Sequence, residues 1–200
     1  MARAYKRSSV ENASIISIES EGIVNIKNLP WTISSLLQGS EHALEFGGGV
    51  WMHAFLNTFN YHRQHAPVSG KVIEAKNVQG AAYLEVDAQC RPIRIMCGPD
   101  APNTPGYQFL QLRGVVVIDN PVLGKVAVLP IGMAMVSSVK LSVRKGDVVK
   151  KGDDISCFLF GGSDIICVFQ AKAGLQVEDF VVSAGGTYSK MGTVLARAPK

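Results

Sequence analysis

The chain has 200 residues, of which 47% are hydrophobic and 18% are charged, and its formal net charge is +4. This length and apolar content suit one folded domain over residues 1–200 and exclude an intrinsically disordered chain. The positive charge is too small and too dispersed to favour a nucleic-acid partner. Because there is no run of about eighteen apolar residues and no apolar N-terminal core, we expect no transmembrane segment and no signal peptide, and a location in the cytoplasm or at the periphery of a membrane.

Strands dominate the elements that the sequence predicts. The polar and basic residues 1–14 are expected to be loose, and short strands are expected at 15–18 and 22–26. A helical turn is expected over 32–38, where Gly39 ends it. The N-terminal quarter therefore contributes small elements, and the main core is expected to follow it.

The first convincing core begins at residues 50–60, which are rich in apolar and aromatic side chains. They lead into Tyr61-His62-Arg63-Gln64-His65-Ala66-Pro67, so both histidines are predicted at a strand end, before a turn and a strand over 71–74. Residues 93–104 are predicted to form an irregular connection. Three neighbouring antiparallel strands are then expected at 107–112, 115–118 and 125–130, divided by Gly114 and by Asp119-Asn120-Pro121.

A short internal repeat follows, in which Lys145-Gly146-Asp147 and Lys151-Gly152-Asp153 each predict a turn between short strands. These turns resemble those of barrel-sandwich domains that carry biotin or lipoate, but no Met-Lys-Met-like hairpin is present to hold a modified lysine. The last strands are expected within 168–200, with a turn at Gly185-Gly186. The predicted fold class is mainly β with few short helices (α+β), built from barrel-sandwich-like antiparallel sheets.

The tetrapeptide Gly161-Gly162-Ser163-Asp164 lies between the apolar runs 155–160 and 165–169. Taken alone, a Gly-Gly-Ser between two strands is typical of a hairpin or a bulge. Glycine also lets a nucleophile approach the backbone closely, so Ser163 Oγ could attack the Gly162 carbonyl and convert the peptide bond into an ester. Elimination and hydrolysis would then leave an N-terminal pyruvoyl group, which withdraws electrons from a substrate as pyridoxal phosphate does.

His62 and His65 are the candidate bases for this chemistry, because an unperturbed imidazole has a pKa of about 6.5. The same pair could instead bind a metal, but a third ligand at suitable spacing is not evident and His53 is the nearest candidate. We therefore expect no metal site. The role of Arg63 is left open, because its guanidinium could bind a substrate anion or pair with a structural acid.

The four cysteines, Cys90, Cys97, Cys157 and Cys167, lack the paired short spacings of a structural zinc site. Reduced thiols are expected, with Cys157 and Cys167 as small core residues that flank the serine turn.

Several segments together resemble the phosphatidylserine decarboxylases and their soluble relatives that decarboxylate amino acids. The resemblance runs over most of the chain and is specific only when its motifs are taken together. These segments are Leu36-Leu37, Gly47-Gly48-Gly49, residues 61–70, 113–119, 128–133 and 136–139, and Lys151-Gly152-Asp153 leading into the serine turn.

This resemblance implies a pyruvoyl-dependent enzyme that activates itself by cleavage between Gly162 and Ser163. The pyruvoyl cofactor is formed from Ser163, His65 assists self-cleavage, and His62 is linked to the decarboxylation step. The cut predicts a β chain of residues 1–162 and an α chain of residues 163–200.

The sequence departs from the family pattern in two places. The family uses an upstream aspartate in self-cleavage, and residues 1–60 contain no aspartate. Either the chain lacks part of the family's N-terminal region, or it is a divergent member that does not process itself; Asp164 and Asp119 are the possible substitutes. Asp164 is itself the second departure, because the family more often has threonine or serine after the reactive serine.

The resemblance implies a phospholipid or small-molecule substrate with a free α-amino acid group. We expect the conversion of phosphatidylserine to phosphatidylethanolamine, with a soluble (aromatic) amino-acid decarboxylase as the first alternative. A non-catalytic member that serves as a binding or scaffold domain is the second. Peripheral contact with a membrane and a homo-oligomer are left open.

Overall fold

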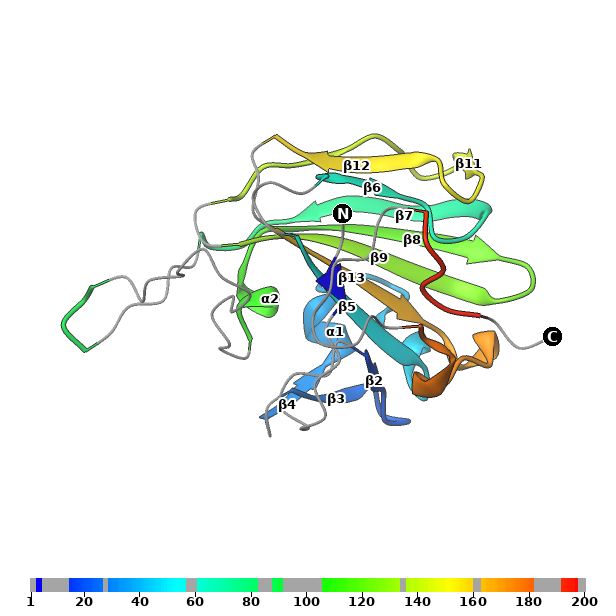
Figure 1. The fold of residues 1–200 in the computed structure, drawn as a ribbon, viewed down its shortest axis with the longest axis horizontal. Helices are drawn as coiled ribbons and strands as arrows, with labels where there is room; N and C mark the ends of the chain where they lie inside the picture. The colour runs from blue at the N-terminus through cyan, green and yellow to red at the C-terminus, as the bar shows by residue number, and fades with distance from the viewer. Residues whose placement is uncertain are drawn as a thin grey trace.

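A computed structural model describes residues 3–4, 15–26, 29–56, 61–82, 88–91, 106–133, 136–159, 163–181 and 192–197, with the backbone alone at 3–4, 55–56 and 163. Within these residues the fold is mainly antiparallel β with few short helices, as the sequence predicts (Figure 1). Among them no helix is long and apolar enough to cross a membrane.

Eight described strands form a large antiparallel sheet in the order β1-β5-β13-β9-β8-β7-β11, with β2 also paired to β5. β13 therefore lies between β5 and β9, with a neighbour on each side along its whole length. The strands are β1 (Arg3–Ala4), β2 (Ile15–Ser17), β5 (Val50–Leu56), β7 (Gly70–Val78), β8 (Arg113–Asn120), β9 (Gly124–Gly132), β11 (Val148–Val149) and β13 (Ser163–Phe169).

The remaining described elements lie on the two faces of this sheet. A small sheet has the order β10-β12-β6, and β3 pairs with β4 in a separate hairpin. Their bounds are β6 (Arg63–His65), β10 (Val139–Leu141), β12 (Asp154–Phe158), β3 (Ile23–Ile26) and β4 (Leu29–Thr32). The helices are α1 (Ile33–Leu36) and α2 (Tyr107–Leu110), with the 3-10 helices η2 (Ala43–Phe46), η3 (Ala171–Ala173) and η4 (Val177–Asp179).

The large sheet separates two apolar cores. The face that packs against the small sheet, here called the small-sheet face, includes Cys167 of β13 and Ile155 of β12 in its core. The opposite face, here called the helix face, buries Ile166 of β13 with Trp51 of β5 and Phe109 of α2. Neighbouring residues of a strand point to opposite faces, so β13 contributes to both cores in alternation. Figure 1 shows the small sheet above the large one and α1 below it.

Most of the predicted strands are confirmed. β2, β3, β5 and β7 begin within three residues of their predicted positions, and the continuous apolar runs at 115–118 and 126–129 are fully buried in β8 and β9. Such short apolar runs are typical of strands buried on both faces. The helical turn over 32–38 is confirmed as α1, and Gly39 follows it with a φ of +69°.

The predicted strand at 107–112 is wrong, because residues 107–110 form the short helix α2. The alternation of apolar and polar residues in Tyr-Gln-Phe-Leu-Gln-Leu suits a strand, but Gly106 turns the chain with a φ of +104°. A Cβ at Gly106 would lie 2.3 Å from the Trp31 ring. Packing against Trp31 therefore overrides the local pattern.

Three other predictions need correction, and two fall outside the described residues. Gly114 lies inside β8 rather than between strands. A Cβ at this position would lie 2.9 Å from the γ-carbon of Pro130, so close packing favours glycine there. Segment 1–14, expected to be loose, contributes β1, which pairs with β5. After β13 the described residues 170–181 and 192–197 form η3, η4 and an isolated bridge between Phe180 and Ala196, and contain no further long strand. Residues 93–104 and Gly185-Gly186 are outside the described residues.

The buried guanidinium of Arg113 holds the ends of α1 and α2 together. It is 1% exposed and donates to the carbonyl oxygens of Ser35 and Leu36, which end α1, and of Phe109 and Gln111, which end α2, at 2.6–3.1 Å. The last carbonyls of a helix have no partner within the helix, so one side chain satisfies both ends. Burial lowers the pKa of the Arg113 guanidinium below its usual value.

Arg113→Met is expected to lower the free energy of unfolding by about 3–5 kcal/mol, because four carbonyl oxygens lose their donor. Arg113→Lys should recover only part of this loss, since an ammonium cannot reproduce the planar fork of donors. Urea denaturation followed by circular dichroism measures both. The exposed Arg144→Lys is the control and should change stability by less than about 0.5 kcal/mol. An Arg113→Met variant as stable as the parent would show that the helix ends do not depend on this side chain.

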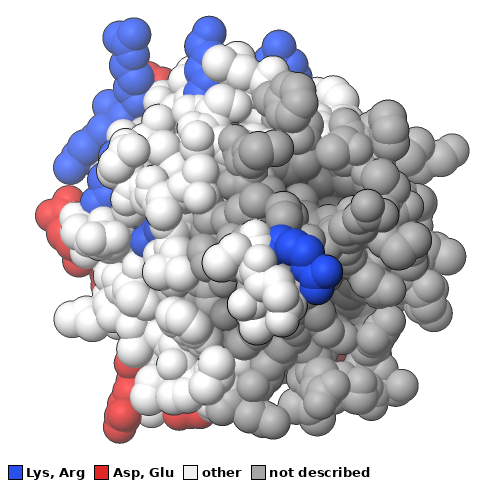
Figure 2. Space-filling view, turned by 90° about the vertical axis from the view of Figure 1, so that its left-hand side faces the viewer, with Lys and Arg blue, Asp and Glu red and all other residues white. Residues whose placement is uncertain are grey.

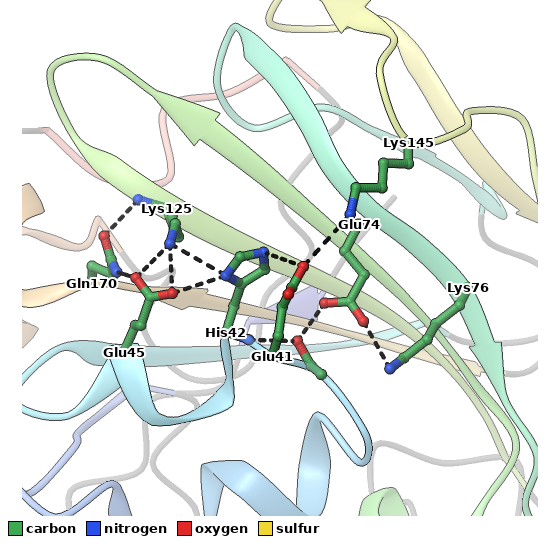
Figure 3. A network of polar contacts seen from close by, with 9 residues as sticks. Glu41, His42, Glu45, Glu74, Lys76, Lys125, Lys145 and Gln170 are labelled. Carbon is green, nitrogen blue, oxygen red and sulfur yellow. Dashed lines mark hydrogen bonds and ion pairs between the residues drawn. The ribbon is translucent and has the colours of Figure 1, made fainter.

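A polar network ties the segment around η2 to Glu74 of β7 and Lys125 of β9 (Figure 3). Lys125 donates to both carboxylate oxygens of Glu45, and His42 Nδ1 lies 2.8 Å from Glu45 Oε1. Ser40 Oγ donates to Glu74 on β7. The Lys125 ammonium holds the pKa of Glu45 below its usual 4.5, with a smaller contribution from His42.

Glu45→Gln is expected to lower the free energy of unfolding at about pH 7 by less than about 1 kcal/mol, because this carboxylate is 39% exposed and screened by solvent. A folded-state pKa below the unfolded value means that the pair stabilises the fold at neutral pH and that this contribution is lost as the pH falls through the folded-state pKa. Parent and variant should therefore converge in urea denaturation at acidic pH. The exposed Glu41→Gln is the control, and a difference that persists at acidic pH would contradict the expectation.

Candidate functional site

The two histidines of the Tyr-His-Arg motif lie at opposite ends of β6. His62 directly precedes the strand, and His65 is its last residue. Between them, the buried Gln64 accepts a hydrogen bond of 2.7 Å from Ser156 Oγ on β12. This interior contact fixes β6 against β12, and with it the spacing of the two imidazoles.

Two hydrogen bonds determine the tautomer of His65. Its Nδ1 lies 2.7 Å from the Gly152 carbonyl oxygen, and its Nε2 lies 2.8 Å from Tyr61 Oη. A carbonyl oxygen can only accept, so Nδ1 carries the proton in the neutral ring and Nε2 accepts from the Tyr61 hydroxyl. The Tyr61 ring stacks on the imidazole with centroids 5.7 Å apart. The basic nitrogen of His65 is therefore Nε2.

The two Lys-Gly-Asp turns are confirmed, and they explain why Gly152 meets His65. In the second turn Gly152 N donates to the Ala66 oxygen and Ala66 N donates to the Asp153 oxygen. The first turn makes the same pair of bonds with Val72, through Gly146 and Asp147. Both glycines have φ near +100°, which favours glycine. The repeat thus clamps the segment after β6 at two points.

His62 lies beside the end of β12 that leads toward Ser163. Its carbonyl accepts from Phe158 N at 3.1 Å, and its ring meets the Phe158 ring edge-on at 6.2 Å. His65, in contrast, is in register with Asp154 at the start of β12. The described backbone therefore brings His62 closer than His65 to the start of the serine connection.

The serine connection crosses from one sheet to the other. β12 belongs to the small sheet, whereas β13 begins at Ser163 between β5 and β9, so the alternative of a simple hairpin is wrong. Ser163 is in register with Leu56 and Gly132. A Cβ at Gly132 would lie 2.0 Å from the Val136 oxygen, so the backbone there is closely packed. Gly162 and the side chain of Ser163 are outside the described residues, so their predicted roles stay predictions.

A buried polar cluster that sequence reasoning missed lies directly after Ser163. Asp164 is 0% exposed, and its Oδ2 accepts from the Tyr107 hydroxyl. His53 Nε2 lies 2.9 Å from the same oxygen, within ion-pair distance but without hydrogen-bond geometry. Among the described residues, Asp164 Oδ1 has no hydrogen-bond partner. The pairing of β13 with β5 places Asp164 opposite Phe55, two positions from His53, and such diagonal neighbours are within reach of long side chains.

This cluster does not supply the aspartate that the family pattern requires near His65. Asp164 lies on the helix face with Ile166, whereas His65 belongs to the small sheet. Asp119, the other possible substitute, is in register with Lys71 and Lys125 at the far end of β8. The acceptor for His65 Nδ1 is instead the Gly152 carbonyl oxygen.

The cysteines contribute little to the site. Cys167 is buried as predicted, and burial raises the pKa of its thiol to about 12, which keeps it unreactive. Cys157 is partly buried, Cys90 is exposed, and Cys97 is outside the described residues. Within the described part of the chain, no group of three His, Cys, Asp or Glu side chains is arranged to hold a metal ion.

Basic side chains gather on the side of the small sheet. Figure 2 shows most of the Lys and Arg atoms of its face near the upper edge, the side on which the small sheet lies in Figure 1. Acidic residues Asp147 and Asp153 of the neighbouring turns accept from the backbone amides of Arg144 and Lys150. The exposed basic residues of the small sheet and its turns are Arg63, Lys140, Arg144, Lys145, Lys150 and Lys151. Of these, Arg63 pairs with Asp154, the structural acid that the sequence left open as its partner, and Lys145 pairs with Glu41.

A family model described as phosphatidylserine decarboxylase matches residues 12–197. The chain belongs to the phosphatidylserine decarboxylase family. The match includes both the Tyr-His-Arg motif and the serine connection, so the resemblance found in the sequence is confirmed over the whole candidate site.

The curated proteins to which this chain is similar include decarboxylases with different names. Decarboxylase iboD of Amanita muscaria is 29% identical over 179 residues, which cover 79% of this chain and 47% of the relative. Phosphatidylserine decarboxylase proenzyme 3 of Schizosaccharomyces pombe is 30% identical over 78% of this chain and 15% of its own length. L-tryptophan decarboxylase of Psilocybe cubensis is 29% identical over 90% of this chain and 42% of its own length. The chain therefore spans less than half of the length of these relatives.

Nitrogen-15 NMR of the folded protein, recorded where the His65 ring is neutral, is expected to show His65 protonated at Nδ1 and unprotonated at Nε2. Tyr61→Phe should shift the Nε2 resonance, because it removes the hydroxyl donor, and should leave Nδ1 protonated by retaining the Gly152 acceptor. A spectrum with the proton on Nε2 in the parent protein would contradict the described geometry.

Proposed function

We propose that the chain is a pyruvoyl-dependent decarboxylase that activates itself by cleavage between Gly162 and Ser163. The observation that carries this proposal is the family match over residues 12–197, which takes in the histidine motif and the serine connection together. The position of Ser163 as the first residue of a central strand also supports it, because the residue after the cut is held by two neighbouring strands.

In the proposed self-cleavage, Ser163 Oγ attacks the Gly162 carbonyl and its proton passes to His65 Nε2, which first releases the hydrogen bond from the Tyr61 hydroxyl. The Ser163 nitrogen takes a proton as the peptide bond breaks, which leaves an ester between the Gly162 carbonyl and Ser163 Oγ. Loss of the Ser163 Cα proton expels Gly162 as a carboxylate, and one water then releases ammonia. The pyruvoyl group so formed supplies an electron-withdrawing carbonyl for the loss of carbon dioxide from an α-amino acid group.

The Gly152 oxygen takes part of the role that an aspartate has in related acid–base systems. It fixes the tautomer and orientation of His65, which leaves the lone pair on Nε2. A neutral carbonyl compensates less of the charge of an imidazolium than a carboxylate does. Following the resemblance to the family, we assign His65 as the base of self-cleavage and His62 as a residue of the decarboxylation step, although the described backbone brings His62 closer to the start of the serine connection.

Two substrate classes share the required α-amino acid group. The basic side chains around the small sheet support phosphatidylserine, since they suit an anionic lipid surface. The similarity to L-tryptophan decarboxylase over 90% of this chain supports a free aromatic amino acid as the substrate. Carbon dioxide release from phosphatidylserine vesicles and from free tryptophan separates the two classes.

The first test of the proposal is the intact mass of the purified protein before and after treatment with phenylhydrazine. Cleavage is expected to give chains of 162 and 38 residues, with the shorter chain carrying the hydrazone. Ser163→Ala should remain uncut and unlabelled, because it has no nucleophile. A single uncut mass for the parent protein would overturn the proposal.

The same measurement tests the roles of the two histidines. His65→Ala is expected to remain uncut, whereas His62→Ala should be cut but release carbon dioxide at least about a hundredfold more slowly, since a general acid or base contributes that much or more. Full cleavage of His65→Ala, with an uncut His62→Ala, would reverse the assignment and make His62 the base.

A further inference from the structure

The buried cluster of Asp164, Tyr107 and His53 has no role in the proposed cleavage chemistry, although it lies next to the residue that is cut. Asp164 is fully buried on the helix face, and both of its partners come from the N-terminal side of the cleavage site. Tyr107 is on α2 and His53 is on β5. The cluster therefore joins the two chains that cleavage would produce.

Cleavage changes what holds the start of β13. Residue 163 becomes a chain terminus, and termini are poorly ordered unless other contacts hold them. Conversion to a pyruvoyl group also removes the nitrogen of residue 163, so its backbone can no longer donate a hydrogen bond to a neighbouring strand. Asp164 is then the first residue of the new chain with both a backbone amide and a buried, bonded side chain.

We infer that Asp164, held by Tyr107 and His53, anchors the pyruvoyl-bearing end of β13 after the chain is cut, and that it is a positioning residue for the cofactor. This inference rests on the proposed function. A carboxylate suits the task because hydrogen bonds to charged groups are stronger than neutral ones. Because Asp164 is fully buried, the loss of the Tyr107 hydroxyl removes the hydrogen-bond donor of the carboxylate and leaves it only the contact with His53.

The partners of Asp164 are themselves rigidly placed. The carbonyls at the end of α2 are bonded to Arg113, and Phe109 stacks on Trp31 with centroids 4.4 Å apart. His53 lies within β5, which is paired with β13 along its length. The anchor therefore connects the new terminus to elements whose positions do not depend on the bond that is cut.

The test uses the full-length protein after self-cleavage, with hydrogen exchange and phenylhydrazine labelling as its readouts. Tyr107→Phe should leave the extent of cleavage unchanged, increase hydrogen exchange in the peptide from residues 164–169 by about tenfold, and increase the rate of hydrazone formation by a similar factor. Hydrogen exchange in β8, which does not pair with β13, should not change. Asp164→Asn keeps an oxygen that can accept from the Tyr107 hydroxyl, so it should retain most of the protection of residues 164–169 from hydrogen exchange. Asp164→Ala should lose this protection.

A double-mutant cycle separates the anchor from a general loss of stability. After Asp164→Ala, the further change Tyr107→Phe should have little effect, because the bond is already absent. Glu45→Gln, in the polar network of Figure 3, is the matched control and should change neither readout.

The outcomes distinguish this inference from the function on which it rests. An uncut parent protein would overturn the proposed function and the anchor with it. A cut parent protein with unchanged exchange and labelling in Tyr107→Phe would overturn the anchor alone. Faster exchange throughout the sheet in Tyr107→Phe would also overturn it, because that result describes a structural residue rather than a local anchor.

Discussion

The buried guanidinium of Arg113 is the interaction on which the helix face depends. α1 and α2 have four residues each, and helices this short are unstable without tertiary contacts. Because Arg113 satisfies carbonyls of both at once, it allows them to lie together over the large sheet. The position of Tyr107 follows from this arrangement, and so does its bond to Asp164. A residue with no part in the chemistry thus determines the surroundings of the proposed cleavage site.

The large sheet divides the proposed functions between its two faces. The small sheet carries both histidines of the Tyr-His-Arg motif, and Gly152 fixes the tautomer of one of them. The helix face carries the cluster around Asp164. β13 carries both Ser163 and Asp164, and alternate residues of a strand point to opposite faces. This arrangement explains how a serine and the residue after it can serve different purposes, one in cleavage chemistry and the other in retention of the product.

The sequence predicts those parts of the fold and site that depend on local pattern. Apolar runs located β8 and β9, and the Lys-Gly-Asp repeat located the turn that contacts His65. The predicted strand at 107–112 was wrong. The alternation of apolar and polar residues there suits a strand, but the turn at Gly106 and its packing against the distant Trp31 ring give a short helix instead. The proximity of His53 to Asp164 was also missed, because it arises from the register of two strands far apart in the sequence. A pairing of this kind cannot be predicted from the spacing of residues within a short motif.

The position of β13 also explains why a cut before Ser163 is compatible with a stable fold. The serine connection joins two sheets that each have their own backbone hydrogen bonds, so its cleavage removes no ladder bond within β6, β10 or β12. β13 remains paired with β5 and β9 and buries Ile166 and Val168 completely. Burial of such side chains contributes roughly 1.5–3 kcal/mol each. Noncovalent contacts of the strand itself can therefore retain the short chain, while the side chain of Asp164 fixes the end that carries the reactive group.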